Sequence, residues 1–386
     1  MKLKPFFRRI HLWLSVPFGL VITLICFSGA MLVFEDEISH ALNRDRYYVD
    51  RVGRRTLPLD SLARRVRAAL PDSVGVSGVT VYSDKERTYK FSLTRPRRAA
   101  MYVDQYTGEV KGRESRLPFF SFMFRLHRWL LDTNPGSGRV FWGKMVVGVS
   151  VLVLVAIMLT GMVIWWPRRA RMLNNALKVK CSHGFIRLAH SLHSAGGVYV
   201  LVPLLIMALT GLTWSFSWYR NAFYGVFGAQ PPAAHGAGAG QSGGAAVHGG
   251  GAGGAVRAHG RGHDTDMFTH WQSVYDRLHR ITPSAPYITV SKGKATVACG
   301  GFGNSRAADS YEFDSVTGRI TSVKLYADGS VQGKLRGWIY SLHVGQWGGW
   351  VTRVLWFVGA LLGAMLPLTG YYMWIRRLWR RRGKTC

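Results

Sequence analysis

The chain has 386 residues, of which 48% are hydrophobic and 18% are charged, and its formal net charge is +30. A basic excess of this size indicates either nucleic acid or an anionic membrane surface as the partner. Apolar patterning excludes the first, because four runs of more than twenty residues contain no Asp, Glu, Lys or Arg: 12–34, 145–166, 194–218 and 354–375. We therefore predict a protein that contacts the lipid bilayer and binds no nucleic acid.

Each apolar run is long enough to be a transmembrane helix, since about 20 residues span the hydrocarbon core. Tryptophans gather at the ends of the runs, as in the aromatic belts of membrane proteins: Trp13, Trp165, Trp166, Trp218, Trp356 and Trp374. Basic residues precede the first run, as in a signal peptide, but the run is longer than a typical signal core. We therefore expect an uncleaved first helix and four transmembrane helices.

Basic residues without any acidic neighbour fill three segments, which lie before the first run, between the second and third runs, and after the fourth. The positive-inside rule places such segments in the cytoplasm. Both termini and the middle loop are therefore predicted to be cytoplasmic. The long segments at about 35–140 and 219–350 then face the opposite side, because long loops do not determine topology.

The predicted segments are transmembrane helix 1 (1–34), a soluble domain (35–116), an interfacial segment with helix 2 (117–167), a cytoplasmic loop (168–189), helix 3 (190–218), a Gly/Ala/His-rich tract (219–266), a second soluble domain (267–334), an interfacial segment with helix 4 (335–376) and a cytoplasmic tail (377–386). The Gly/Ala/His-rich composition is typical of a flexible tether. Its histidines, His235, His248, His259 and His263, are expected to be solvated linker residues rather than metal ligands.

An internal repeat relates the first and second parts of the chain. A histidine precedes a Ser-Gly or Thr-Gly pair near each span: His11 before Ser28-Gly29, His193 before Thr210-Gly211, His127 before Thr160-Gly161, and His343 before Thr369-Gly370. The soluble segments also match, around Thr107-Gly108 and Thr317-Gly318. We therefore predict a mainly α membrane protein in two pseudo-symmetric halves, related by an axis along the membrane normal.

Each soluble segment is predicted to be a small α+β domain, with one helix followed by strands. Helical spacing at 59–70 precedes strand-like alternation at 76–82, 88–93 and 99–104. In the second segment the helix is 268–280, and the strands are 287–290, 294–298 and 310–314. Gly108 and Gly318 are expected to supply the positive φ of tight turns.

Four histidines occupy repeat-related positions at the membrane boundaries, and the repeat pairs His11 with His193 and His127 with His343. Two neutral imidazoles that face each other across an apolar gap suit a haem iron with two axial histidines. A Cys-x-x-Cys-His motif does not occur, so any haem is held non-covalently. The sequence leaves His190 open as an alternative to His193, because it lies one turn earlier on the same helix face; His183 is a further candidate.

Other interpretations of these histidines are weaker. A lone histidine at a helix end is usually structural, but four related positions are harder to explain in that way. Zinc prefers four tetrahedral ligands, and neither pair has a cysteine or carboxylate nearby in the sequence. A proton relay would need acidic residues inside the spans, and the spans contain none.

Several short motifs together resemble the PepSY-associated transmembrane family: Arg9-Ile-His-Leu-Trp13, Phe27-Ser-Gly-Ala-Met-Leu-Val-Phe34, Leu126-His-Arg-Trp129, Leu159-Thr-Gly161 with Trp165-Trp-Pro-Arg168, Leu192-His193 and Leu342-His-Val-Gly345. Within the family the chain is most similar to FoxB-type ferric-siderophore reductases of the bacterial inner membrane. The glycine that usually follows the third-span histidine is shifted here. That departure is a second reason why the choice between His190 and His193 stays open.

The resemblance implies PepSY-like periplasmic domains and two haem b groups, one held by His11 and His193 and the other by His127 and His343. It implies an oxidoreductase that takes electrons from a cytoplasmic or quinol donor and reduces a periplasmic ferric siderophore. The substrate is then expected near an aromatic cluster at the outer face: Trp129, Trp338, Tyr340, Trp347 and Trp350. Two alternatives are a membrane-anchored PepSY-type binding or inhibitor protein without enzymatic activity, and a siderophore permease.

Overall fold

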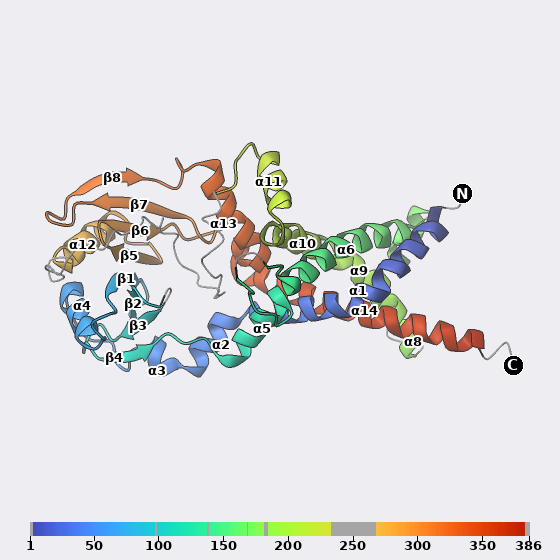
Figure 1. The fold of residues 1–386 in the computed structure, drawn as a ribbon, viewed down its shortest axis with the longest axis horizontal. Coiled ribbons are helices and arrows are strands. Elements are labelled where there is room, and N and C mark those ends of the chain that lie inside the picture. Colours follow the sequence, from blue (N-terminus) through green and yellow to red (C-terminus); the bar gives the residue numbers. More distant parts are fainter. Residues whose placement is uncertain are drawn as a thin grey trace. The chain divides into compact units, whose positions relative to one another are not determined.

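Two units make up the computed structural model, which describes residues 3–96, 99–136, 139–167, 169–180, 184–232 and 268–382. The helical unit comprises residues 1–35, 118–245 and 338–386, and the sheet unit comprises residues 36–117 and 246–337. Figure 1 shows the helices of the first and the strands of the second. The histidines of the predicted tether, together with His183 and the end of the predicted tail, lie outside the described residues.

Three continuous helices of the helical unit are long and apolar enough to cross a membrane, among the residues that the structure describes. They are α1 (Leu3–Leu32), α6 (Trp142–Trp165) and α14 (Gly349–Arg382). The third predicted span consists of two helical segments, Phe185–Tyr199 and Leu201–Ser215, which are bent by 61°. The described chain thus has three candidate spans, or four if the bent pair crosses as one.

The bend in the third span has local causes in the sequence. Its first segment contains α8 (Phe185–Ser191), a π-helical turn η2 (Leu192–Gly196) and α9 (Gly197–Tyr199). Its second segment is α10 (Leu201–Ser215), and Pro203 lies in the first turn, where a missing N–H costs little. The sequence suggested no break beyond this proline. The π-turn was not foreseen, and such turns are frequent at functional sites.

Close packing between α1 and α14 depends on an unusual polar contact. The Tyr371 hydroxyl accepts a hydrogen bond from the Leu20 N–H (3.1 Å) and donates one to the Val16 carbonyl (2.6 Å), so it is inserted into the hydrogen-bond ladder of α1. Gly19 leaves the necessary space, because a Cβ there would lie 2.7 Å from the Tyr371 hydroxyl oxygen. The glycine therefore serves helix packing.

Shorter helices connect or extend these elements: α2 (Glu35–Leu42), α3 (Arg44–Tyr47), α5 (Pro118–Trp129), η1 (Ala170–Met172), α7 (Leu173–Ala176), α11 (Ser217–Val226), α13 (Val331–Val344) and η4 (Gln346–Gly348). These shorter helices were not predicted separately from the spans and soluble segments. Two of them, α5 and α13, end close to His127 and His343 and are therefore relevant to the site.

One antiparallel sheet of eight strands, in the order β4-β3-β2-β1-β5-β6-β7-β8, forms the centre of the sheet unit. Its strands are β1 (Val76–Tyr82), β2 (Tyr89–Leu93), β3 (Ala100–Val103), β4 (Val110–Arg113), β5 (Tyr287–Ser291), β6 (Lys294–Ala298), β7 (Ala308–Phe313) and β8 (Ile320–Lys324). The segments predicted as two small domains share this sheet through the β1–β5 pairing. That pairing satisfies two strand edges that separate four-stranded sheets would leave open.

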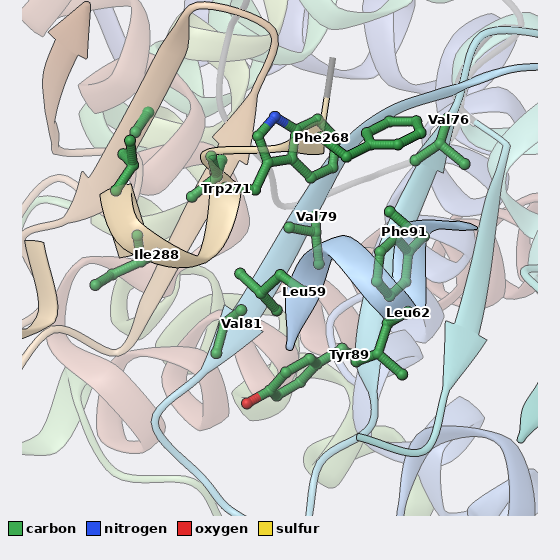
Figure 2. Packing of buried hydrophobic residues seen from close by; sticks show 14 of the residues in the cluster. Leu59, Leu62, Val76, Val79, Val81, Tyr89, Phe91, Phe268, Trp271 and Ile288 are labelled. Carbon is green, nitrogen blue, oxygen red and sulfur yellow. The ribbon is translucent and has the colours of Figure 1, made fainter. Parts of the chain in front are cut away.

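Helices α4 (Leu59–Ala68) and α12 (Trp271–Ile281) contribute to a single hydrophobic core with the sheet. Figure 2 shows Leu59, Val79, Phe91 and Trp271 within this core. All four side chains are at most 1% exposed. Burial of each such side chain contributes about 1.5–3 kcal/mol, so the core joins the two repeated segments into one cooperative unit.

The predicted helices and strands of the sheet unit are confirmed to within a few residues, whereas β4 and β8 were missed. Both missed strands lie at the edges of the sheet, and all of their residues are half-buried or exposed, so they lack a clear alternation of apolar residues. The predicted turn glycines are confirmed, with φ of +74° at Gly108 and +68° at Gly318.

Candidate functional site

Two pairs of histidines lie inside the helical unit. In the first pair, the ring centroids of His11 and His193 are 6.3 Å apart and the ring planes are inclined by 85°. In the second pair, the centroids of His127 and His343 are 6.1 Å apart and the planes are inclined by 54°. The structure thus brings together the residues that the repeat pairs. His190 is exposed, so His193 and not His190 lies beside His11.

The first pair is held by neighbouring spans through Nδ1. His11 Nδ1 lies 3.1 Å from the Ile157 carbonyl and 3.0 Å from the Thr160 hydroxyl, both on α6. His193 Nδ1 lies 3.0 Å from the Leu366 carbonyl and 3.0 Å from the Thr369 hydroxyl, both on α14. Each span therefore presents the same two groups to one ring.

These contacts fix the tautomer of both rings. Thr160 donates its own hydroxyl proton to the Ile157 carbonyl (2.9 Å), and Thr369 donates to the Leu366 carbonyl (2.8 Å). The hydroxyl oxygens are then left to accept, as the carbonyls do, so Nδ1 must carry the proton. In the neutral ring Nε2 is consequently unprotonated, which is the state that a metal ligand requires.

The second pair is held in a related but unequal way. His343 Nδ1 contacts the Met207 carbonyl (3.0 Å) and the Thr210 hydroxyl (3.1 Å) on α10. His127 Nδ1 contacts the Ile25 carbonyl (2.8 Å) on α1. Ser28 stands where the other anchors have threonine, and its hydroxyl donates to the Leu24 and Ile25 carbonyls without reaching the ring. His127 therefore has one acceptor where each of the other three histidines has two.

A glycine follows the hydroxyl residue in all four anchors and makes room for the ring. A Cβ on Gly29 would lie 2.8 Å from His127 Cε1, and one on Gly211 would lie 3.1 Å from His343 Cε1. The corresponding distances are 3.3 Å for Gly161 to His11 and 3.4 Å for Gly370 to His193. The repeat alignment rests on these Ser/Thr-Gly pairs, but their position beside the rings was not predicted from the sequence. Their recurrence with a histidine was the available signal.

The separation of the rings fits one metal ion between each pair. Two imidazoles on opposite sides of one ion have centroids roughly 6 Å apart, because each metal–nitrogen bond is about 2 Å and each nitrogen lies about 1 Å from its centroid. Within the described ranges, no group of three or more His, Cys, Asp and Glu residues surrounds either pair. The donor set therefore fits two axial imidazoles better than a tetrahedral zinc site, with Nδ1–H held as expected of a ligating histidine.

The two pairs lie toward opposite ends of α1. His11 belongs to this helix, and His127 contacts it at Ile25 and Gly29. At 1.5 Å per residue, the positions are about 21–27 Å apart along the helix axis. That spacing approaches the thickness of the hydrocarbon core, which is about 30 Å.

The short helices that carry the second pair end differently. After His343, Gly345 turns the chain with φ of +75°, and Trp356 Nε1 donates to the Leu342 carbonyl (2.6 Å). After His127, helix α5 ends at Trp129 and is followed by Leu130 and Leu131, whose φ values are +50° and +67°. Leucine pays about 1–2 kcal/mol for a left-handed conformation, so the end of α5 is strained.

The predicted aromatic substrate cluster is only partly accessible. Tyr340 is 9% exposed, whereas Trp350 is 61% exposed. Trp350 packs against Phe34, with centroids 5.2 Å apart, and the Arg353 guanidinium lies over both rings. Tyr340 is therefore unsuited to contact a soluble substrate, and Trp350 keeps an accessible face.

The family model of the PepSY-associated TM region matches residues 8–377. The chain belongs to this family. The matched range includes all four histidines and all four Ser/Thr-Gly anchors. A comparison with the curated proteins finds no match. Family membership and the candidate spans together identify a PepSY-associated membrane protein.

Proposed function

We propose that this PepSY-associated membrane protein is a two-haem reductase that moves electrons across the bacterial inner membrane and reduces a periplasmic ferric siderophore. The observation that carries the proposal is the pair of facing histidines toward each end of α1, each with Nδ1 against a backbone carbonyl, which would leave Nε2 for a metal. The siderophore as acceptor rests on the resemblance to FoxB-type reductases.

His11 and His193 would hold one haem b, and His127 and His343 the other, without covalent attachment. When bound, haem supplies reversible one-electron chemistry. The residues of this chain fix the ring orientation, keep the Nδ1 protons in place through carbonyl and threonine acceptors, and surround the pairs with apolar helices. The net reaction consumes one electron for each Fe(III) reduced, so a two-electron quinol donor would serve two iron ions.

The proposed topology has four spans, with the bent third segment crossing as one. Both termini lie in the cytoplasm and the sheet unit lies in the periplasm, which agrees with the distribution of basic flanks. The two halves are related by pseudo-symmetry, which the four Ser/Thr-Gly anchors support. The first pair is then near the cytoplasm and the second near the periplasm. Reduction lowers the affinity of a siderophore with hard oxygen ligands for its iron, because Fe(II) is softer and less charged than Fe(III).

A permease is the second candidate, because the 61° bend between Tyr199 and Leu201 resembles the broken helices of transporters. Proteoliposomes that contain a membrane-impermeant reductant and face an external ferric trihydroxamate distinguish the two. We expect Fe(II) to form outside, where a chelator traps it, without entry of the trihydroxamate, and we expect His11→Ala to abolish this. Uptake of the intact complex without Fe(II) formation would support the permease instead. A PepSY-type binding protein would give neither result.

A further inference from the structure

The four candidate ligands differ in how many acceptors hold their Nδ1 protons. His11 and His193 each have a carbonyl and a threonine hydroxyl, so the first pair has four acceptors. His343 has the same two groups, but His127 has only the Ile25 carbonyl, so the second pair has three. The difference arises at Ser28, which is fully buried: its hydroxyl donates to carbonyls of its own helix, as the Thr210 hydroxyl does, but forms no hydrogen bond with the ring of His127.

Acceptors on Nδ1–H change the electronic character of a ligating imidazole. Each acceptor draws the proton away from the ring and raises the basicity of Nε2. A more basic ligand stabilises the more highly charged, oxidised metal, and hydrogen bonds to ligands are an established means of tuning a haem potential. A haem held by a pair with more acceptors therefore has the lower reduction potential, if other contributions are equal.

Nearby charges act in the same direction. Arg128 follows His127 directly and is half-buried, with its guanidinium 5.4 Å from the centroid of Trp129. A fixed positive charge near the second pair favours the reduced form there. The basic residues Arg8 and Arg9 near His11 are exposed, and water and salt screen exposed charges. The charge of Arg128 therefore acts in the same direction as the difference in acceptors.

We propose that the threonine hydroxyls that contact Nδ1 set the order in which the two haems are reduced. A haem held by the first pair would have the lower reduction potential, and a haem held by the second pair the higher one. Thr160 and Thr369 are then positioning residues that make the first pair the better electron donor. Electrons would then reside mainly on a haem held by the second pair. This is the periplasmic pair under the proposed function, on which this inference rests. Ser28 supplies no fourth acceptor to the second pair, so a haem held by that pair would keep the higher potential.

A potentiometric titration of the detergent-purified full chain, followed by visible absorption, tests the order. We expect two reduction steps in the wild type, and we expect His343→Ala to remove the step at higher potential. Thr160→Val combined with Thr369→Val removes two acceptors and should raise the lower step toward the higher one. Ser28→Ala is the matched control, because its hydroxyl does not reach His127, and it should leave both steps in place.

The conservative variants Thr160→Ser and Thr369→Ser keep an acceptor and should retain the wild-type steps, which separates a lost hydrogen bond from a folding defect. Loss of the lower step in His343→Ala, a single step in the wild type, or an unchanged lower step in the double valine variant would overturn the inference. Wild-type protein without any haem would instead overturn the proposed function, so the two failures are distinguishable.

Discussion

The two histidine pairs have nearly the same ring separation, but they lie on different kinds of helix. The first pair lies on the spans themselves, with His11 on α1 and His193 in the π-turn η2, and both rings have equal anchors. The second pair lies on the short helices α5 and α13, and its anchors and helix ends are unequal. The repeat therefore maintains the histidines and the glycines beside them, while the hydroxyl anchors and the helix ends differ.

The largest expected effect comes from removing one histidine of a pair. His11→Ala and His343→Ala should each lower the haem content of the purified protein by about half, because an iron with two axial histidines loses one ligand. His190→Ala is the matched control, since this exposed residue does not face His11. If His190→Ala lowered the haem content and His193→Ala did not, the assignment of the first pair would be wrong.

A smaller effect should follow from filling the space beside the rings. Gly29→Ala would place a Cβ 2.8 Å from His127, whereas Gly370→Ala would place one 3.4 Å from His193, which is close to ordinary contact. Overpacking costs about 1–3 kcal/mol, so Gly29→Ala should weaken haem retention at the second pair on the order of tenfold. Gly370→Ala should retain both haems in the same dilution assay. Equal losses in the two variants would contradict the unequal fit of the rings.

The smallest effect is expected at the strained end of α5. Leu131→Gly removes the cost of a left-handed leucine, about 1–2 kcal/mol, but adds chain entropy to the unfolded state. We expect a net stabilisation of up to about 1 kcal/mol, measured as a slightly higher Tm. Gly345→Leu, at the corresponding end of α13, should lower the Tm, because φ is +75° there and Trp356 leaves no space for a side chain. A lower Tm in Leu131→Gly would show that the leucine side chain outweighs the strain.

Much of this architecture follows from local patterns in the sequence. Uninterrupted apolar length predicted α1, α6 and α14, and alternation predicted the six better-buried strands. The edge strands β4 and β8 were not predicted, because half-exposed strands lack an alternation of apolar and polar residues. The β1–β5 pairing was not predicted either. It joins strands some 200 residues apart, and local sequence does not determine which strand edges pair.

The sequence predicted the candidate ligands, but it did not predict the carbonyl and hydroxyl groups that hold their Nδ1 atoms. Repeat spacing paired His11 with His193 and His127 with His343, and the structure brings both pairs together. The anchors of Thr160 and Thr369 depend on which carbonyl each neighbouring helix presents, so helix packing had to be known first. Similarly, the sequence contains Ser28 in place of threonine, but only the structure shows that its hydroxyl does not hydrogen-bond to His127.

The number of haems bound per chain is the most direct test of the central claim. A pyridine haemochrome assay on the detergent-purified wild-type protein, together with its oxidised visible and electron paramagnetic resonance spectra, gives the count and the axial ligation. We predict two non-covalent haem b groups per chain, both low-spin as expected for two axial histidines. A colourless protein would contradict the proposed function, and a single haem would show that one of the two pairs is not a haem site.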